Sequence, residues 1–207
     1  MSDQKLRDLE RRWRETGSVE DEAAYLRERV RVGDLTQERL ELAAYCGHEG
    51  ARAALGGVVS CGPKGASELL ADLRSWGAEE VGRAFLVIAE AVLPLWRAVS
   101  HDTAERESVE AVVVALRLWI AQPCEARLTA LDQAIQSAES ATWHPASVAV
   151  VVGASAILDE NPEALSHAVN SGLVAARWSE SQGVDAMRAR VCLAALGSDR
   201  AVTAEPG

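Results

Sequence analysis

Two long apolar runs, residues 84–96 and 111–121, mark the centre of the chain. Each run is interrupted by a single charged residue, Glu90 in the first and Arg117 in the second. Each run also has a tryptophan near its carboxyl end. A helix that is apolar on nearly every side is usually buried. We therefore expect both runs to form central helices, with their tryptophans in the core.

The helical spacing of apolar residues continues on both sides of these runs. Leu69, Leu73 and Trp76, for example, fall on one face of a helix. Capping residues, glycines and prolines separate the successive segments. This pattern predicts an all-α protein, either an irregular multi-helix bundle or a short helical array of about eight to ten helices.

Two positions complicate the helical pattern. Residues 148–152 read VAVVV, which favours a strand. A single strand among helices would have no pairing partner, so we predict a third central helix over residues 146–158. Pro94 lies inside the first apolar run and predicts a kink there, because proline removes an amide donor and its ring clashes one turn back.

Turn residues divide the chain into four predicted parts. Residues 1–57 form a small helical module of short helices that end at glycines. Residues 58–65, VVSCGPKG, have no helical period and are predicted to be a linker. Residues 66–197 form the main helical bundle, and residues 198–207 a disordered tail.

The charge of the chain excludes some classes of partner. The formal net charge is −10, with 31 acidic and 21 basic residues. Binding to nucleic acid or to an anionic membrane relies on clustered cations, so neither is expected. The longest apolar runs are shorter than the ~20 residues of a membrane-spanning helix, and the charged amino terminus does not resemble a signal peptide. We expect a cytoplasmic protein whose partner carries a basic surface.

No residue in the chain is predicted to have a catalytic, cofactor-binding or metal-binding role. The common nucleotide-binding, metalloprotease and serine-hydrolase motifs are absent from the sequence. Cys46, His48 and Cys61 would offer three metal ligands, but a fourth is not evident and zinc ligands usually occur in closely spaced pairs. A buried thiol beside a histidine at a helix end is the favoured interpretation. Residues 62–65, GPKG, lack the length of a phosphate-binding loop and belong to the linker.

Glu90 and Arg117 are the main candidate site residues. A buried charge is costly unless it is paired. If the two apolar runs form an antiparallel pair, both residues fall at nearly the same height along it. The favoured interpretation is a buried ion pair between neighbouring helices, or charges that emerge on a narrow solvent-exposed face. The functional alternative is a carboxylate with a shifted pKa in a pocket.

Parts of the chain resemble known bacterial proteins. Residues 93–96 (LPLW), the segment from Trp119 to Pro123 and residues 124–127 (CEAR) resemble a group of α-helical bacterial immunity proteins. Residues 43–48 (AAYCGH) and 51–56 (ARAALG) resemble a helical module of multi-domain myxobacterial proteins. Neither resemblance implies a catalytic residue. The first implies a role in binding and blocking a toxin.

These observations favour a non-enzymatic helical protein that binds another protein. An immunity factor that binds and neutralises a toxin with a basic surface is the first hypothesis. A scaffold or regulatory adaptor is the second. The third is a hydrolase or metal-dependent enzyme with a pocket near Glu90. A deep pocket with converging His, Glu and Arg side chains would favour the enzyme, whereas an acidic groove or exposed apolar patch would favour binding.

Overall fold

The computed structural model describes residues 2–57, 65–141 and 143–197. These residues form eleven α-helices and two short 3₁₀ helices, and no strand occurs among them. The all-α prediction is confirmed, and the VAVVV segment lies within helix α9. The helices are slightly more numerous than the predicted eight to ten, because short segments such as α4 (Glu49–Ala54) form separate helices. The predicted linker, except for Gly65, and the predicted tail lie outside the described residues.

The chain divides into two compact units. Unit 1 comprises residues 1–62 together with 188–207, and unit 2 comprises residues 63–187. The boundary near the carboxyl end therefore falls inside helix α11 (Glu180–Ala195). The sequence predicts one bundle over residues 66–197, but residues 188–197 group with the amino-terminal helices instead.

Unit 1 is built from short helices with well-defined ends. Besides α4 and the end of α11, it contains α1 (Ser2–Thr16), α2 (Val19–Val32) and α3 (Gln37–Tyr45). Ser18 and Thr36 cap α2 and α3 by accepting backbone N–H groups with their hydroxyl oxygens, as N-cap residues do.

Two arginines explain why the end of α11 belongs to unit 1. Arg29 donates to the carbonyl of Leu196 at 2.8 Å, and Arg39 donates to the carbonyl of Ala194. The last carbonyls of a helix have no partner within the helix, so these guanidinium groups satisfy them. Neither bond is apparent from the sequence, because its partners are more than 150 residues apart.

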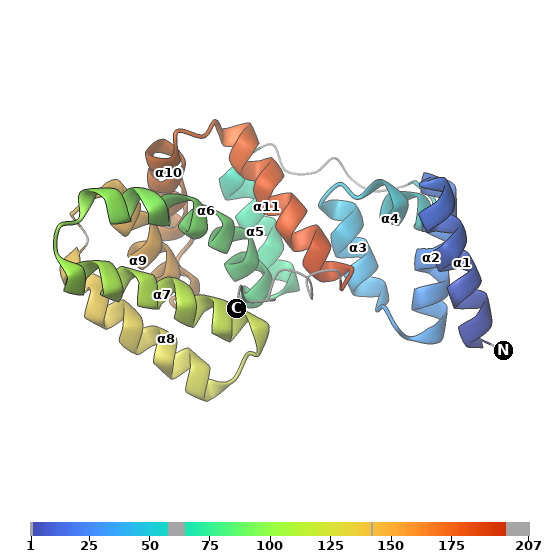
Figure 1. Cartoon of the computed structure of the whole chain (residues 1–207), viewed down its shortest axis with the longest axis horizontal. Helices are drawn as coiled ribbons and strands as arrows, with labels where there is room; N and C mark the ends of the chain where they lie inside the picture. Colours follow the sequence, from blue (N-terminus) through green and yellow to red (C-terminus); the bar gives the residue numbers. More distant parts are fainter. Residues whose placement is uncertain (1, 58–64, 142, 198–207) are drawn as a thin grey trace. The chain divides into compact units, whose positions relative to one another are not determined.

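Unit 2 contains the long apolar helices. Its elements are α5 (Ala66–Leu73), η1 (Arg74–Trp76), α6 (Ala78–Val99), α7 (Thr103–Ala121), α8 (Glu125–Ala138), η2 (Glu139–Ala141), α9 (Pro145–Leu158), α10 (Pro162–Ala176) and the start of α11. Helix α6 contacts α5, α7, α9 and α10, while α9 contacts α6, α7, α8 and α10. Figure 1 shows α7 lying between α6 and α8. The core of unit 2 is therefore organised around α6 and α9.

Close approach of α6, α9 and α10 depends on two glycines. A Cβ atom on Gly153 of α9 would lie 2.2 Å from the Phe85 ring of α6. A Cβ atom on Gly172 of α10 would lie 2.2 Å from the side chain of Ile88. Phe85 and Ile88 are completely buried, so neither side chain can easily move away. The missing side chains thus allow the large residues of α6 to pack against the backbones of α9 and α10.

The tryptophans of the two central helices lie in the core. Trp96 is completely buried and Trp119 is 6% exposed, as predicted. Helix α6 continues through Pro94, which is exposed. None of the helices in the described part of the chain combines the length and apolar character that crossing a bilayer requires.

Candidate functional site

Glu90 and Arg117 lie side by side, but at the surface. Arg117 Nη2 donates to Glu90 Oε1 at 2.7 Å, between α6 and α7. The Arg117 side chain is 53% exposed and that of Glu90 is 26% exposed. The two residues therefore pair between neighbouring helices as predicted, but the pair is not buried: the charges lie on a solvent-exposed face, which was the second form of the prediction. The two residues lie on the solvent-facing edge of the α6–α7 seam, where water keeps both charges solvated.

A second ion pair shares the register of the first. Arg97 Nε lies 2.6 Å from Glu110 Oε1. Arg97 follows Glu90 by seven residues and Glu110 precedes Arg117 by seven, which is about two helical turns in each case. The two pairs are therefore repeats along one antiparallel seam. This arrangement favours a structural role for Glu90, and Glu90 lines neither of the two unit 2 cavities described below.

Cys46 and His48 are arranged as the favoured interpretation predicted, a buried thiol beside a histidine at a helix end. His48 Nδ1 accepts the backbone N–H of Ala51 at 3.1 Å, so this atom caps α4. Its other nitrogen, Nε2, lies 3.6 Å from a carboxylate oxygen of Glu22. Cys46 is buried, and Cys61 lies outside the described residues. Within residues 2–57, 65–141 and 143–197, His, Cys, Asp and Glu side chains form no group of three that could hold a metal ion.

The thiol of Cys192 is buried and has a raised pKa. Burial, followed by the negative charge of Glu22, raises the pKa of Cys192 to about 11. The thiol is therefore protonated at neutral pH, whereas nucleophilic and metal-binding cysteines act as thiolates.

The remaining histidines occupy separate elements. His101 is exposed between α6 and α7, and His167 is exposed on α10. His144 caps α9, where its Nδ1 accepts the N–H of Ala146 at 3.1 Å. Its ring also packs near Trp96. These contacts assign His144 a role in starting a helix.

An acidic groove crosses the surface of unit 2 between α8, α9 and the start of α10. Its volume is about 490 Å³, within the ~300–1,000 Å³ range of ligand pockets. Ile135, Val151 and Val152 supply apolar walls. Glu139 and Asp159 supply two carboxylates. None of the nine described residues that line the groove is basic.

The position of the two carboxylates strengthens the negative potential of the groove. Glu139 is the C-cap residue of α8, and Asp159 is the C-cap residue of α9. The carboxyl end of a helix carries a partial negative charge, which favours basic residues there. Neither helix has a basic residue in its last turn. Asp159 at the end of α9 is therefore in an electrostatically unfavourable position, which a bound cation would relieve, whereas Glu139 also begins η2, where an acid is favoured.

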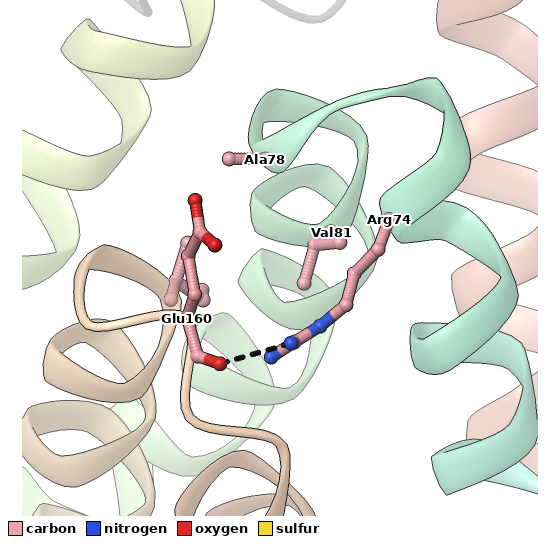
Figure 2. A pocket seen from close by; sticks show the side chains of 5 residues that line it. Arg74, Ala78, Val81 and Glu160 are labelled. Atoms are coloured by element: carbon pink, nitrogen blue, oxygen red, sulfur yellow. Dashed lines mark hydrogen bonds between the residues drawn. The ribbon is translucent and has the colours of Figure 1, made fainter.

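A smaller cavity lies next to η1 and the amino end of α6. Its volume is about 110 Å³, and it is lined by Arg74, Ala78, Val81, Ile157 and Glu160. Arg74 Nη1 donates to the backbone carbonyl of Glu160 at 2.9 Å. Figure 2 shows that the Glu160 carboxylate points toward Ala78, away from the Arg74 guanidinium. One cationic and one anionic group thus lie at different ends of an otherwise apolar cavity.

Neither cavity was predicted from the sequence, although one signal for the groove is present there. No lysine or arginine occurs from residue 128 to residue 176. The same segment contains five acids: Asp132, Glu139, Asp159, Glu160 and Glu163. The segment includes most of α8 and all of α9 and α10. Half of the net charge of the chain is therefore carried by the segment that forms the groove.

Comparisons with known proteins do not add a relative: no protein-family model, no curated protein and no solved structure matches the chain.

Proposed function

We propose that this protein binds another protein through the acidic groove of unit 2. The observation that carries this proposal is the combination of apolar walls with carboxylates at the carboxyl ends of two helices. The complementary ligand is a lysine or arginine side chain whose neighbours in the partner are apolar. Its cation would lie between Glu139 and Asp159, and its neighbours would cover Val151 and Val152.

The surroundings of the groove support a basic partner. The 49-residue segment that supplies the groove has no basic residue except histidine, so its field repels anions and attracts cations over a wide surface. Such complementarity raises the association rate and selects against acidic partners. The apolar walls add affinity that salt does not screen.

A toxin with a basic surface is the partner class that we favour. This part of the proposal rests on the resemblance of residues 93–96, 119–123 and 124–127 to bacterial immunity proteins. A protein that blocks a toxin needs a surface complementary to it and no catalytic group. An acidic groove with apolar walls would provide such a surface for a basic toxin. A cellular basic protein held by an adaptor would use the same chemistry.

Selection from a random peptide library, displayed on phage, tests the groove before any partner has been identified. We expect enrichment of peptides with lysine or arginine next to apolar residues. The double variant Glu139→Lys/Asp159→Lys should lose at least tenfold in affinity for the selected peptides, since both carboxylates are reversed. The double variant Asp132→Lys/Glu163→Lys is the matched control. It changes the net charge equally at exposed acids outside the groove lining, and it should bind nearly as well as the native chain.

Two results would contradict the proposal. One is enrichment of peptides without a cation, and the other is equal loss of binding in the two double variants. The immunity role has a separate test. Toxin-like proteins encoded beside the gene should co-purify with the chain and lose toxicity when co-expressed with it, and the groove variant should fail in both respects.

A further inference from the structure

The small cavity of unit 2 is lined by both a positive and a negative side chain, whereas the charged residues that line the groove are all negative. Three apolar residues, Ala78, Val81 and Ile157, form its wall. Val81 and Ile157 are almost completely buried, so the wall is part of the packed structure. Arg74 supplies a positive charge and Glu160 a negative charge.

The two charged groups do not neutralise each other directly. Arg74 uses Nη1 to bind the backbone carbonyl of Glu160, at 2.9 Å. Figure 2 shows the Glu160 carboxylate at the other end of that residue, beside Ala78. Within the described residues, the Glu160 side chain takes part in no hydrogen bond or ion pair. A guanidinium group has five N–H donors, so Arg74 has donors left for a ligand.

We propose that this cavity binds a small zwitterion, an amino acid with a short aliphatic side chain. Its ammonium group pairs with the Glu160 carboxylate and its carboxylate with the Arg74 guanidinium. Its side chain contacts Val81 and Ile157. A ligand with only a positive charge would face Arg74 without a counter-charge, and one with only a negative charge would face Glu160 in the same way.

The size of the cavity and its surroundings set further limits on the ligand. A volume of about 110 Å³ is well below the ~300 Å³ at which pockets begin to accept drug-sized molecules. Arg74 is the only basic residue among the described residues of the lining, which fixes the direction of the ligand carboxylate. Because the ammonium, carboxylate and side chain have three different partners, the site should also distinguish the two enantiomers.

This proposal does not depend on the binding of a protein at the groove. Glu160 lines the small cavity, whereas its neighbours Asp159 and Asn161 line the groove. The connection between α9 and α10 thus contributes alternate residues to two separate sites. Binding at either site can be measured while the other is empty.

Titration of the ¹⁵N-labelled protein with L-valine, followed by amide chemical shifts, tests the proposal. We expect saturable shifts confined to residues near Arg74–Trp76, the start of α6 and the α9–α10 connection. Two analogues remove one charge each: isobutylamine lacks the carboxylate, and isovalerate lacks the ammonium group. Each should bind at least tenfold more weakly, since a hydrogen bond between charged groups is lost. D-valine should also bind more weakly.

Substitutions in the chain provide the second part of the test. Glu160→Gln keeps the backbone carbonyl that Arg74 binds, so the fold should remain and the affinity for L-valine should fall at least tenfold. Arg74→Gln should weaken L-valine similarly, and Arg74→Lys, which retains the charge, should recover part of the loss. Glu163→Gln is the matched control, because Glu163 is an exposed acid of the same region that does not line the cavity.

The results that would overturn the proposal are specific. Absence of saturable shifts with 50 mM L-valine, a concentration of about ten times the weakest dissociation constant that we would accept, contradicts it. Equal binding of L-valine and isobutylamine would show that only a cation is recognised. Unchanged affinity in Glu160→Gln would place the bound amino acid elsewhere. None of these outcomes affects the peptide binding expected at the groove.

Discussion

The helices of unit 1 are highly charged, whereas unit 2 contains the two longest helices of the described residues, α6 and α7, and a largely apolar core. Residues 1–57 include 22 charged residues, whereas the 125 residues of unit 2, 63–187, include 25. In unit 1 charged side chains tie the helices together, as Lys5 of α1 does when it binds Glu28 of α2 at 2.9 Å. In unit 2 the buried contacts between helices are made by large apolar side chains and two glycines, and the ion pairs between α6 and α7 lie at the surface.

Because the units are held together differently, we expect their stabilities to respond to different changes. Apolar packing is little affected by salt or pH, but it depends on volume and shape. Ion pairs and hydrogen-bonded carboxylates depend in addition on ionisation and on salt. We therefore expect unit 2 to respond mainly to changes in side-chain size and unit 1 mainly to acid.

Truncation of Trp96 should have the largest effect. Trp96 is 0% exposed, and Trp96→Ala should reduce the free energy of unfolding by about 3–5 kcal/mol, because it leaves a large cavity beside α6. Chemical denaturation followed by circular dichroism measures the loss. Trp143→Ala is the control, since the Trp143 side chain is 55% exposed although its ring packs on Trp96. A loss below 1 kcal/mol in Trp96→Ala, or equal losses in both variants, would show that the core of unit 2 lies elsewhere.

Adding one methyl group at Gly153 should destabilise unit 2 by overpacking. In Gly153→Ala the new Cβ would lie 2.2 Å from the Phe85 ring, so Phe85 or α9 must move, at a cost of about 1–3 kcal/mol. The same denaturation measurement applies. Phe85→Leu makes room for the methyl group, so the double variant should lose less than the sum of the two single losses. Additive losses would mean that the Cβ and the ring do not compete for space.

Acid should weaken unit 1 through Glu28. Hydrogen bonds from Arg31, at 2.6 and 2.9 Å, and then from Lys5 lower the pKa of this buried carboxylate from 4.5 to about 2. A carboxylate whose pKa is lower in the folded state than in the unfolded chain stabilises the fold at every pH above its unfolded pKa. This contribution disappears as the pH falls from about 4.5 to about 2. Glu28→Gln lacks the contribution at every pH, so its stability should be lower at pH 7 and should depend less on pH below 4.5.

Hydrogen exchange of α1 and α2, measured by mass spectrometry between pH 2.5 and 7, locates this effect in unit 1. Glu15→Gln is the control, because Glu15 is an exposed acid of α1. If Glu28→Gln and the native chain show the same pH dependence, the ion pairs of Glu28 contribute little to unit 1. A larger acid effect in α6 and α9 than in α1 and α2 would contradict the contrast between the units.

The fold class could be predicted from the sequence because helix signals are local. Asp102, for example, accepts the N–H groups of Ala104 and Glu105 and starts α7, as its position before an apolar helix indicates. The register of α6 and α7 could also be predicted, since helical rise alone places Glu90 opposite Arg117. The burial of individual side chains could not be predicted in this way. Val114 and Leu118 lie within an apolar run, yet each is about half exposed, because apolar sequence does not determine which helix face finds a neighbour.

The candidate sites were less predictable for the same reason. The groove joins Ile135 and Glu139 of one segment to Val151 and Asp159 of another, and the small cavity joins Arg74 to Glu160. Both depend on contacts between separate helices, which periodicity does not reveal. The absence of basic residues from 128 to 176 signals an acidic surface, but only the structure shows that two of its carboxylates line one groove.

The Glu90–Arg117 pair should have the smallest effect, and it tests whether unit 2 contains any of the charge dependence assigned to unit 1. Both side chains are partly exposed, so their coupling energy in a double-mutant cycle with alanine should be only about 0.2–1 kcal/mol. The parallel cycle on Arg97 and Glu110, which lie in the same seam, should give a similar value. Both couplings should decrease in 0.5 M salt, since the Debye length then falls to about 4 Å.

Exchange of the charges, Glu90→Arg with Arg117→Glu, should recover most of the stability that either single reversal loses. A coupling above 2 kcal/mol that salt does not reduce would mean that the pair is shielded from water in solution, and that unit 2 depends on charge as strongly as unit 1.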